Sequence, residues 1–218
     1  MEYFGEENRV HLSGRILTAP VFSHKTYGEA FYLMMLGAFR KSGCEDRIRL
    51  IVSERILGGR SPQEGDLVDL YGQIRTYNRE VNGKNHLEIN VFVRELYYWG
   101  EEHPDGVFNG YGSFSYCNEI SLEGFLCKVP VRRTSPLGRE ICDVMLAVPR
   151  QYQRTDYIPC ILWGRTAQCA AELPVGAQIT LAGRLQSRGY VKVLPEGTVE
   201  RTAYELSAME LEILEENF

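Results

Sequence analysis

The 218-residue sequence contains an internal repeat, which restricts the possible folds more than any other feature. Apolar, glycine and charged residues of the first half recur in the second half at a constant offset of 110 residues, without a gap. The matched residues are Asn8, Leu12, Gly14, Pro20, Val21, Gly28, Met35, Leu36, Arg40, Asp46, Ile48 and Ile51 in the first half, and Asn118, Leu122, Gly124, Pro130, Val131, Gly138, Met145, Leu146, Arg150, Asp156, Ile158 and Ile161 in the second. An offset of 111 then aligns Gly65, Leu70 and Gly72 with Gly176, Leu181 and Gly183. Such self-similarity predicts two copies of one domain.

Each copy contains about five segments with strand character and a turn-rich opening between the first two. In the second copy the segments are Glu119 to Cys127, Arg139 to Val148, Ile158 to Trp163, Gln178 to Gln186 and Ala203 to Ile213. Gly124 lies inside the first of them and suggests a bulge or a sharp bend, as a strand needs at the corner of a small barrel. We therefore predict an all-β protein of two tandem five-stranded barrels.

The connector between the third and fourth segments differs between the copies. In the second copy the alanine-rich stretch from Ala167 to Leu173 predicts a short helix. In the first copy Gly58, Gly59 and Pro62 leave little room for helix beyond one turn. The domains are predicted at residues 1–98 and 118–218, joined by a linker at 99–117 that is rich in glycine and aromatic residues. Because its rings are too apolar for a solvated tether, this linker is expected to pack between the domains or against a partner.

Composition argues against a membrane protein and against an exported one. The longest apolar stretches are far shorter than the roughly 20 residues that a membrane-spanning helix requires. The first ten residues, MEYFGEENRV, show neither the basic nor the apolar region of a signal peptide. We therefore predict a cytoplasmic protein that does not associate with membranes.

The sequence shows no pattern of metal or catalytic chemistry. Its six cysteines include no CxxC pair and are interpreted as free, small core residues, and its four histidines have no spacing that would suit zinc. The nucleophile elbow GxSxG, the phosphate loop GxxxxGK[ST] and the dinucleotide fingerprint GxGxxG do not occur. The chain is therefore predicted to be no enzyme and to use no metal or cofactor.

The net charge of −5 conceals an uneven distribution of acidic residues. Acids are concentrated near the N-terminus, in the middle segment and at the C-terminal end, so that the body of each copy is more basic than the whole chain. This distribution suits binding of a polyanion, although ordinary mixing of surface charges would produce it equally well.

The segment from Asp156 to Tyr190 interleaves aromatic and basic residues. Proteins that bind single-stranded nucleic acid stack bases on rings while cations follow the phosphates. The residues that suit these two roles are Tyr157, Trp163, Arg165, Arg184, Arg188 and Tyr190. A buried structural role for Trp163 is the alternative.

Residues 118 to 214 resemble the bacterial single-stranded DNA-binding proteins of the OB-fold class. The motifs that carry the resemblance are NEISLEGFL, LAVPRQY, DYIPCILWGRTAQ, GAQITLAGRLQSRGY and TAYELSAMELEIL, in this order. The first half resembles the same family more weakly, through NRVHLSGRI, DRIRLIVSERI, GDLVDLYGQIRTYNR and HLEINVFV. The whole chain is therefore similar to family members with two OB folds on one chain.

This resemblance implies binding of single-stranded DNA with little sequence preference, in replication, recombination or repair. The family's stacking rings fall on Tyr152, Tyr157, Trp163 and Tyr190, and its basic position after the third strand falls on Arg165. Cations chosen on electrostatic grounds are Arg150, Arg154, Arg184 and Arg188, with Arg40 and Arg55 in the first copy. The family works with four OB folds, which implies a homodimer here, and other replication or repair proteins are implied partners.

The first copy departs from the family pattern. Ser42, Arg47 and Ser53 stand at the positions equivalent to Tyr152, Tyr157 and Trp163, so the second copy is expected to dominate affinity. The counter-hypothesis is that other rings of the first copy replace them; these are Phe31, Tyr32, Tyr71 and Tyr77.

A second departure is at the C-terminus, where Glu215, Glu216, Asn217 and Phe218 imitate the family's acidic tip without its long arm. Two rival functions remain open. One is an OB-fold interaction or dimerisation module of a replication-restart or mobile-element complex. The other is a nuclease that would use Asp143 and Asp156, which lack an evident third carboxylate.

Overall fold

The computed structural model describes residues 7–81, 83–100, 114–135, 137–194 and 197–214. It divides into two compact units. The first unit is Arg9–Glu119, and the second contains Ile120 onward together with Glu7 and Asn8. Glu7 belongs to the second unit because its carbonyl accepts from Glu123 N (2.7 Å) and its carboxylate accepts from Ser121 Oγ (3.0 Å).

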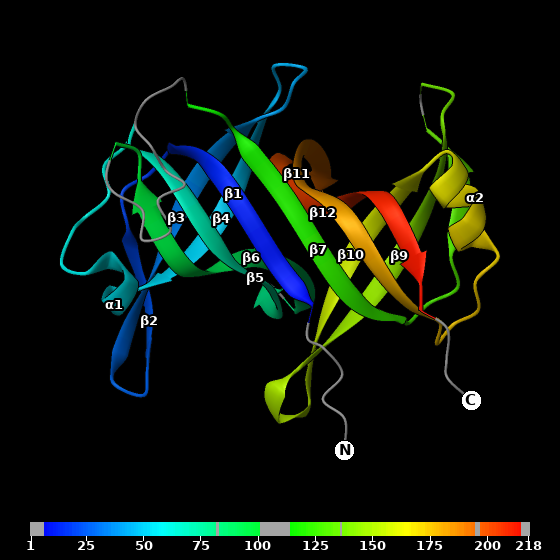
Figure 1. The fold of residues 1–218 in the computed structure, drawn as a ribbon, viewed down its shortest axis with the longest axis horizontal. Helices are drawn as coiled ribbons and strands as arrows, with labels where there is room; N and C mark the ends of the chain where they lie inside the picture. Colours follow the sequence, from blue (N-terminus) through cyan, green and yellow to red (C-terminus); the bar gives the residue numbers. More distant parts are fainter. Residues whose placement is uncertain (1–6, 82, 101–113, 136, 195–196, 215–218) are drawn as a thin grey trace. The chain divides into compact units, whose positions relative to one another are not determined.

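The first unit is a closed β-barrel. Its elements are β1 (Asn8–Ile16), β2 (Val21–Thr26), β3 (Glu29–Phe39), β4 (Glu45–Ser53), α1 (Glu54–Leu57), β5 (Leu67–Val81) and β6 (Lys84–Tyr98) (Figure 1). The barrel order is β1-β5-β6-β4-β3, and β3 closes it by pairing with β1 at Arg15 and Gly37. All these pairs are antiparallel except β4 with β6. The short strand β2 extends the sheet beyond β3.

The second unit repeats this topology. Its elements are β7 (Cys117–Leu126), β8 (Val131–Thr134), β9 (Glu140–Arg150), the 3-10 turn η1 (Gln151–Gln153), β10 (Arg154–Trp163), α2 (Arg165–Ala171), β11 (Gln178–Leu194) and β12 (Gly197–Ile213). The barrel order is β7-β11-β12-β10-β9, with β9 closing on β7 at Phe125 and Ala147. The pair β10 with β12 is parallel, as in the first unit. The prediction of two tandem five-stranded OB barrels is therefore confirmed.

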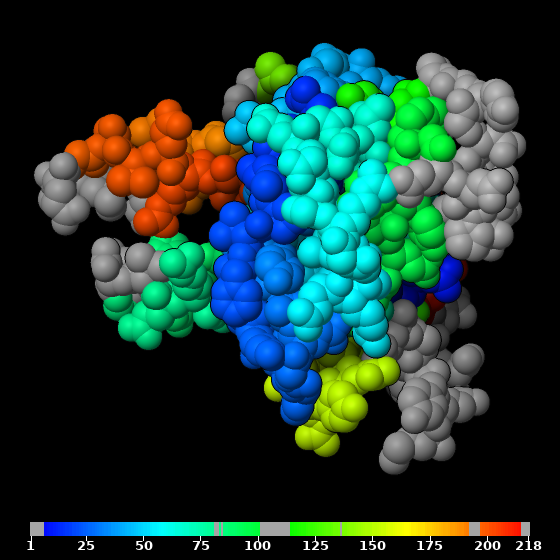
Figure 2. Space-filling model, turned by 90° about the vertical axis from the view of Figure 1, so that its left-hand side faces the viewer, coloured from blue at the N-terminus to red at the C-terminus, as the bar shows by residue number. Residues whose placement is uncertain are grey.

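The connectors follow the sequence prediction, and the openings add a strand. The helix α2 has seven residues, whereas α1 has four and ends at Gly58 in the left-handed conformation. The helix α1 lies against β3, where Ala30 N donates to Glu54 Oε1 (3.0 Å). In Figure 2 the cyan part of the chain, which includes α1, lies beside the blue part, which includes β2 and β3. The turn-rich openings hold β2 and β8, since each pairs with the strand that follows it.

The repeated residues are the core of each barrel. Leu12 and Leu122 are fully buried, and so are three further pairs related by the offset of 110 or 111. These pairs are Leu36 with Leu146, Ile48 with Ile158, and Leu70 with Leu181. Burial of each such side chain contributes about 1.5–3 kcal/mol. The apolar residues of the repeat are therefore the core positions of two barrels that pack in the same way.

Gly124 marks the place where β7 changes partners, as does Gly14 in β1. The strand β7 pairs with β11 up to Phe125 and with β9 from Phe125 onward. A Cβ at Gly124 would lie 2.5 Å from the Ala147 carbonyl oxygen, and one at Gly14 would lie 2.5 Å from the Gly37 carbonyl oxygen. Only glycine lets the two backbones approach so closely, which explains the predicted sharp bend at the barrel corner.

The expectation that the cysteines are core residues holds for only some of them. Cys142 and Cys160 are buried core residues as expected, but Cys44 and Cys169 are exposed, because they lie in a turn and on the outer side of α2.

The acidic end from Glu215 to Phe218 and residues 101–113 of the linker lie outside the described residues. No helix among the residues that the structure describes is long and apolar enough to cross a membrane.

Candidate nucleic-acid interface

The outer face of β10 presents two of the predicted rings. Residues alternate between the two faces of a strand, and Asp156, Ile158 and Cys160 are buried inside the barrel. Tyr157 and Trp163 therefore share the outer face, where Tyr157 is 48% exposed and Trp163 is half-buried. The period of two in the sequence is what places both rings on the side away from the core.

Trp163 is held by a polar network that crosses to neighbouring strands. Its indole Nε1 donates to Ser207 Oγ on β12 (2.9 Å). With the Gln186 amide oriented to satisfy its neighbours, its oxygen accepts from Ser207 Oγ (3.1 Å) and from Arg184 Nε (2.7 Å). The network fixes the indole and the guanidinium on one face, where Ser207 and Gln186 link Trp163 to Arg184.

The other two predicted rings lie in the turn η1 and on the strand β11. Tyr152 is 91% exposed in η1, between β9 and β10, and its φ of 61° is in the left-handed region. A tyrosine adopts this region at a cost, so the turn presents the ring to solvent in a strained backbone. Tyr190 is 41% exposed on β11, far along the long hairpin that β11 forms with β12.

The predicted arginines of the second barrel differ in their surroundings. Arg154, Arg165 and Arg188 are exposed, on β10, on the first turn of α2 and on β11 respectively. Arg150 instead donates through an Nη to Asp156 Oδ1 (3.4 Å), and Asp156 is fully buried. Arg154 pairs with Arg150 across the β9–β10 hairpin, which places two cations opposite each other beside Tyr152.

The ion pair of Arg150 recurs in the first barrel at the offset of 110. Arg40 donates through Nε and an Nη to the two carboxylate oxygens of Asp46, at 2.7 and 2.6 Å, and Asp46 is fully buried. Both predicted cations therefore neutralise a buried carboxylate of their own barrel. Of the two carboxylates considered for a nuclease, Asp156 belongs to this pair and Asp143 is held by Arg133.

The first barrel uses the equivalents of the predicted rings for other purposes. Ser53, at the position of Trp163, is the N-cap of α1 and accepts from Ile56 N (3.3 Å). Arg47, at the position of Tyr157, lies 3.6 Å from a carboxylate oxygen of Glu45. The predicted cation Arg55 is 81% exposed and lies 3.7 Å from Glu29 Oε1.

The first barrel nevertheless carries rings on its outer face, one strand away. Phe92 on β6 pairs with Ile51, just as Ser207 on β12 pairs with Ile161, so Phe92 stands where the second barrel has Ser207. Its ring lies 5.7 Å from that of Phe31, and the Arg94 guanidinium lies 4.9 Å from its centroid. Sequence reasoning missed Phe92 and Arg94, because a serine stands at the aligned position of the other copy.

A charged cluster lies beside these rings. Glu88 Oε2 accepts from the Tyr77 hydroxyl (2.6 Å) and lies 2.5 Å from an Arg49 Nη, and Arg79 is 3.4 Å from Glu88 Oε1. Partial burial opposes the charged form of Glu88, but the hydrogen bond from Tyr77 and the charge of Arg49 outweigh it and lower its pKa. Partial burial and the bond to Glu88 raise the pKa of Tyr77. Tyr77 is thereby fixed with its ring 42% exposed.

Asn90 on β6 is fully buried close to Phe92. Neither its amide nitrogen nor its amide oxygen finds a hydrogen-bond partner in the part of the chain that the structure describes. An unsatisfied buried amide costs about 1–3 kcal/mol. This cost makes Asn90 a destabilising feature of the first barrel that its core packing must offset.

Comparisons with known proteins agree on one family. The model of the Single-strand binding protein family matches residues 117–214. The chain is 34% identical over 80 residues to single-stranded DNA-binding protein B of Bacillus subtilis, covering 34% of this chain and 71% of that protein. It is 27% identical over 195 residues to the single-stranded DNA-binding protein of Thermus thermophilus, covering 82% of this chain and 74% of that protein.

A solved structure extends the similarity to the fold of both halves. The crystal structure of the wild-type single-stranded DNA-binding protein from Thermus aquaticus superimposes with a TM-score of 0.72 and 23% identity. The match covers 96% of this chain and 94% of that one. This chain therefore shares with that protein a fold of two barrels on one chain.

Proposed function

The chain belongs to the single-strand binding protein family, and from this premise we propose that it binds single-stranded DNA with little sequence preference on the outer faces of its barrels. The observation that carries the proposal is the group of Trp163, Tyr157 and Arg184 on one face of the second barrel, away from the core. Rings stack on any base, and arginine contacts phosphate, so neither contact reads sequence.

The second barrel would supply most of the stacking. Tyr157 and Trp163 offer two platforms on the sheet, and Tyr152 and Tyr190 extend the path along the two hairpins. The exposed cations Arg154, Arg165 and Arg188 would follow the phosphates. Arg150, held by buried Asp156, would contribute mainly by positioning the β9–β10 hairpin.

The first barrel would bind the strand through a different set of residues. Phe92 would provide a stacking surface, supported from beneath by the buried ring of Phe31, and Arg94 and Arg49 would provide the neighbouring charge. Phosphate would compete with Glu88 for Arg49, so this half is expected to bind with stronger dependence on salt. Arg40, which donates to Asp46 through Nε and one Nη, would act on the fold rather than on DNA.

Assembly and cellular role belong to the same proposal. A homodimer would present four OB folds to one strand, and paired identical surfaces are the commonest symmetry of soluble oligomers. We place the protein in the cytoplasm at the nucleoid, acting in replication, recombination or repair together with other proteins of those processes. The rival role, an interaction module of a replication-restart or mobile-element complex, predicts weak binding that does not depend on the length of the strand.

Titration with labelled oligonucleotides of increasing length tests the proposal. We expect quenching of tryptophan fluorescence, affinity that rises with length up to a defined site size, and steep weakening with salt. Duplex of the same sequence serves as the competitor. Equal affinity for duplex and single strand would reject the proposal, and affinity independent of length would favour the interaction module.

A further inference from the structure

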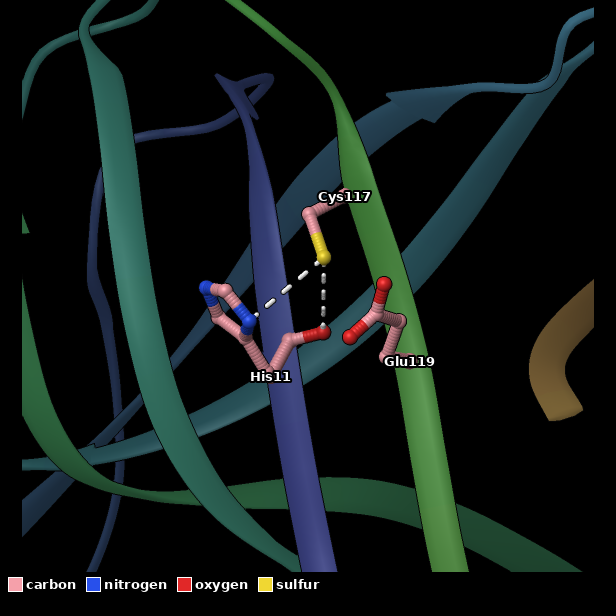
Figure 3. A group of neighbouring side chains, drawn as sticks. All are labelled: His11, Cys117 and Glu119. Atoms are coloured by element: carbon pink, nitrogen blue, oxygen red, sulfur yellow. Dashed lines mark hydrogen bonds between the residues drawn. The ribbon is translucent and has the colours of Figure 1, made fainter. Parts of the chain in front are cut away.

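A cluster of three side chains in the compact unit Arg9–Glu119 has the composition of a metal site. His11 lies on β1, and Cys117 and Glu119 lie at the start of β7; all three belong to the same compact unit. One ligand atom of each lies within 4.8 Å of those of the others. Cys117 and Glu119 are two residues apart on a strand and therefore point to the same side, toward His11 (Figure 3).

The distance between the nitrogen and sulfur atoms suits a shared tetrahedral ion. Cys117 Sγ lies 3.5 Å from His11 Nδ1. Zinc bonds of about 2.3 Å to sulfur and about 2.05 Å to nitrogen, at a tetrahedral angle, would separate these two atoms by about 3.6 Å. An ion can therefore occupy the position between them without moving either strand, and Glu119, on an exposed and flexible side chain, closes the third side.

The imidazole is oriented for this role by contacts on its other edge. His11 Nε2 is 2.9 Å from Asp69 Oδ1 on β5, and Asp69 is buried and also accepts from Ser13 Oγ. The ring also stacks on Tyr71 with centroids 4.5 Å apart. A carboxylate that accepts the second ring N–H of a ligating histidine fixes the tautomer and directs the other nitrogen at the metal.

We propose that His11, Cys117 and Glu119 bind one divalent transition-metal ion of the zinc type, with a fourth position for water. The sulfur and nitrogen donors select Zn²⁺ over Mg²⁺ or Ca²⁺, which prefer oxygen ligands. On binding, the thiol loses its proton to solvent and forms the metal–sulfur bond, and an imidazolium form of His11 likewise loses its Nδ1 proton.

The direct test is titration of the full-length, metal-free protein with Co²⁺. We expect one Co²⁺ per chain, visible bands of tetrahedral cobalt and a near-ultraviolet thiolate-to-cobalt band, all removed by Zn²⁺, which binds such sites more tightly. Cys117→Ser should abolish the thiolate band. The matched control is Cys44→Ser, which removes an exposed thiol of the same barrel and should leave the spectrum unchanged.

The Asp69→Asn variant tests whether Asp69 orients the His11 ring for the metal or only stabilises the fold. It should weaken metal affinity about 10- to 100-fold while leaving the stoichiometry at one. Trp99 fluorescence reports whether each variant retains a folded first barrel. Absence of a thiolate band at one equivalent, or a band that survives Cys117→Ser, would overturn the proposal. Its failure would leave the DNA-binding proposal untouched, because none of the three residues belongs to the proposed interface.

Discussion

The two barrels have equivalent cores and equivalent buried ion pairs, but they carry their exposed aromatic rings on different strands. In the second barrel Trp163 ends β10 and bonds to Ser207 on the neighbouring β12. In the first barrel Ser53 ends β4 as a helix cap, and the ring is on β6 at Phe92. The aromatic side chain of the first barrel therefore lies on the neighbouring strand of the same outer face. Residues inside a barrel are fixed by packing, whereas an outer face needs only a ring somewhere along the path of the strand.

The largest expected difference between the barrels concerns the ion pair. Arg40→Gln leaves buried Asp46 without the charge of its arginine and should destabilise the first barrel by about 3–5 kcal/mol. Arg150→Gln should lower the free energy of unfolding of the second barrel by less. Arg150 contacts its aspartate at 3.4 Å, whereas Arg40 makes two shorter hydrogen bonds. Urea unfolding followed by Trp99 or Trp163 alone, with the other changed to Phe, reports each barrel.

Arg55→Gln serves as the control for that experiment, since Arg55 is 81% exposed and should change stability by less than about 0.5 kcal/mol. Equal losses from Arg40→Gln and Arg150→Gln would show that the number of contacts to the carboxylate does not matter.

Removal of single rings tests the asymmetry of DNA binding. Trp163→Ala and Tyr157→Ala should each weaken binding of single-stranded DNA by about 1–3 kcal/mol, roughly 5- to 150-fold. Phe92→Ala and Tyr77→Ala should have smaller effects, because the first barrel relies more on charge. Fluorescence anisotropy with a labelled oligonucleotide measures all four. Comparable losses in the two barrels would mean that both stack bases and that the second does not dominate.

Asn90 allows the stability and the affinity of the first barrel to be separated. Asn90→Leu removes a buried amide without a partner in the described chain and should stabilise this barrel by about 1 kcal/mol. If the amide serves the bound strand, affinity should fall at the same time. Urea unfolding and anisotropy on the same variant decide this, and loss of stability would show that the amide is satisfied in solution.

A further predicted difference between the barrels is a dependence of stability on pH. The pKa of His11 is raised to about 10, first by its bond to Asp69 and then by its contact with Cys117. Because the folded pKa exceeds the unfolded value of about 6.5, the stabilisation is complete below pH 6.5 and is lost as the pH rises toward 10. In the presence of chelator the first barrel should therefore be less stable at pH 8.5 than at pH 6.5. Residues 120–218 contain no histidine, so the stability of the second barrel should not show this dependence on pH.

His11→Gln is the control for the pH experiment. This variant should remove the dependence of the first barrel between pH 6.5 and 8.5. If the dependence persists without His11, another group of the first barrel is responsible.

Much of the fold could be predicted from sequence because the barrel repeats. The constant offset exposed the buried positions, such as Leu12 and Leu122, and the alternation around Tyr157 indicated which rings point outward. The short strands β2 and β8 were missed, since their residues are exposed and carry no apolar pattern. They are held by backbone pairing with the next strand, which leaves no mark on side-chain composition.

The sites were harder to predict for two physical reasons. The contact between Phe92 and Phe31 joins residues far apart in sequence, and the aligned Ser207 gives no hint of a ring. His11 and Cys117 are 106 residues apart, so no local spacing indicates the metal cluster. Arg40 and Arg150 are predicted as phosphate contacts from their charge, and sequence does not show that a buried carboxylate faces each of them.

The hydrogen bonds of Glu7 to Ser121 and Glu123 have a consequence for folding. Glu7 and Asn8 belong to the second unit and the chain returns to that unit at Ile120, so the first unit is inserted between two segments of the second along the chain. When the first barrel unfolds, both of its ends stay attached to a folded host, and the segment becomes a closed loop rather than a dangling end. Loop closure removes entropy from the unfolded ensemble. The inserted barrel should therefore refold faster than the same segment expressed alone.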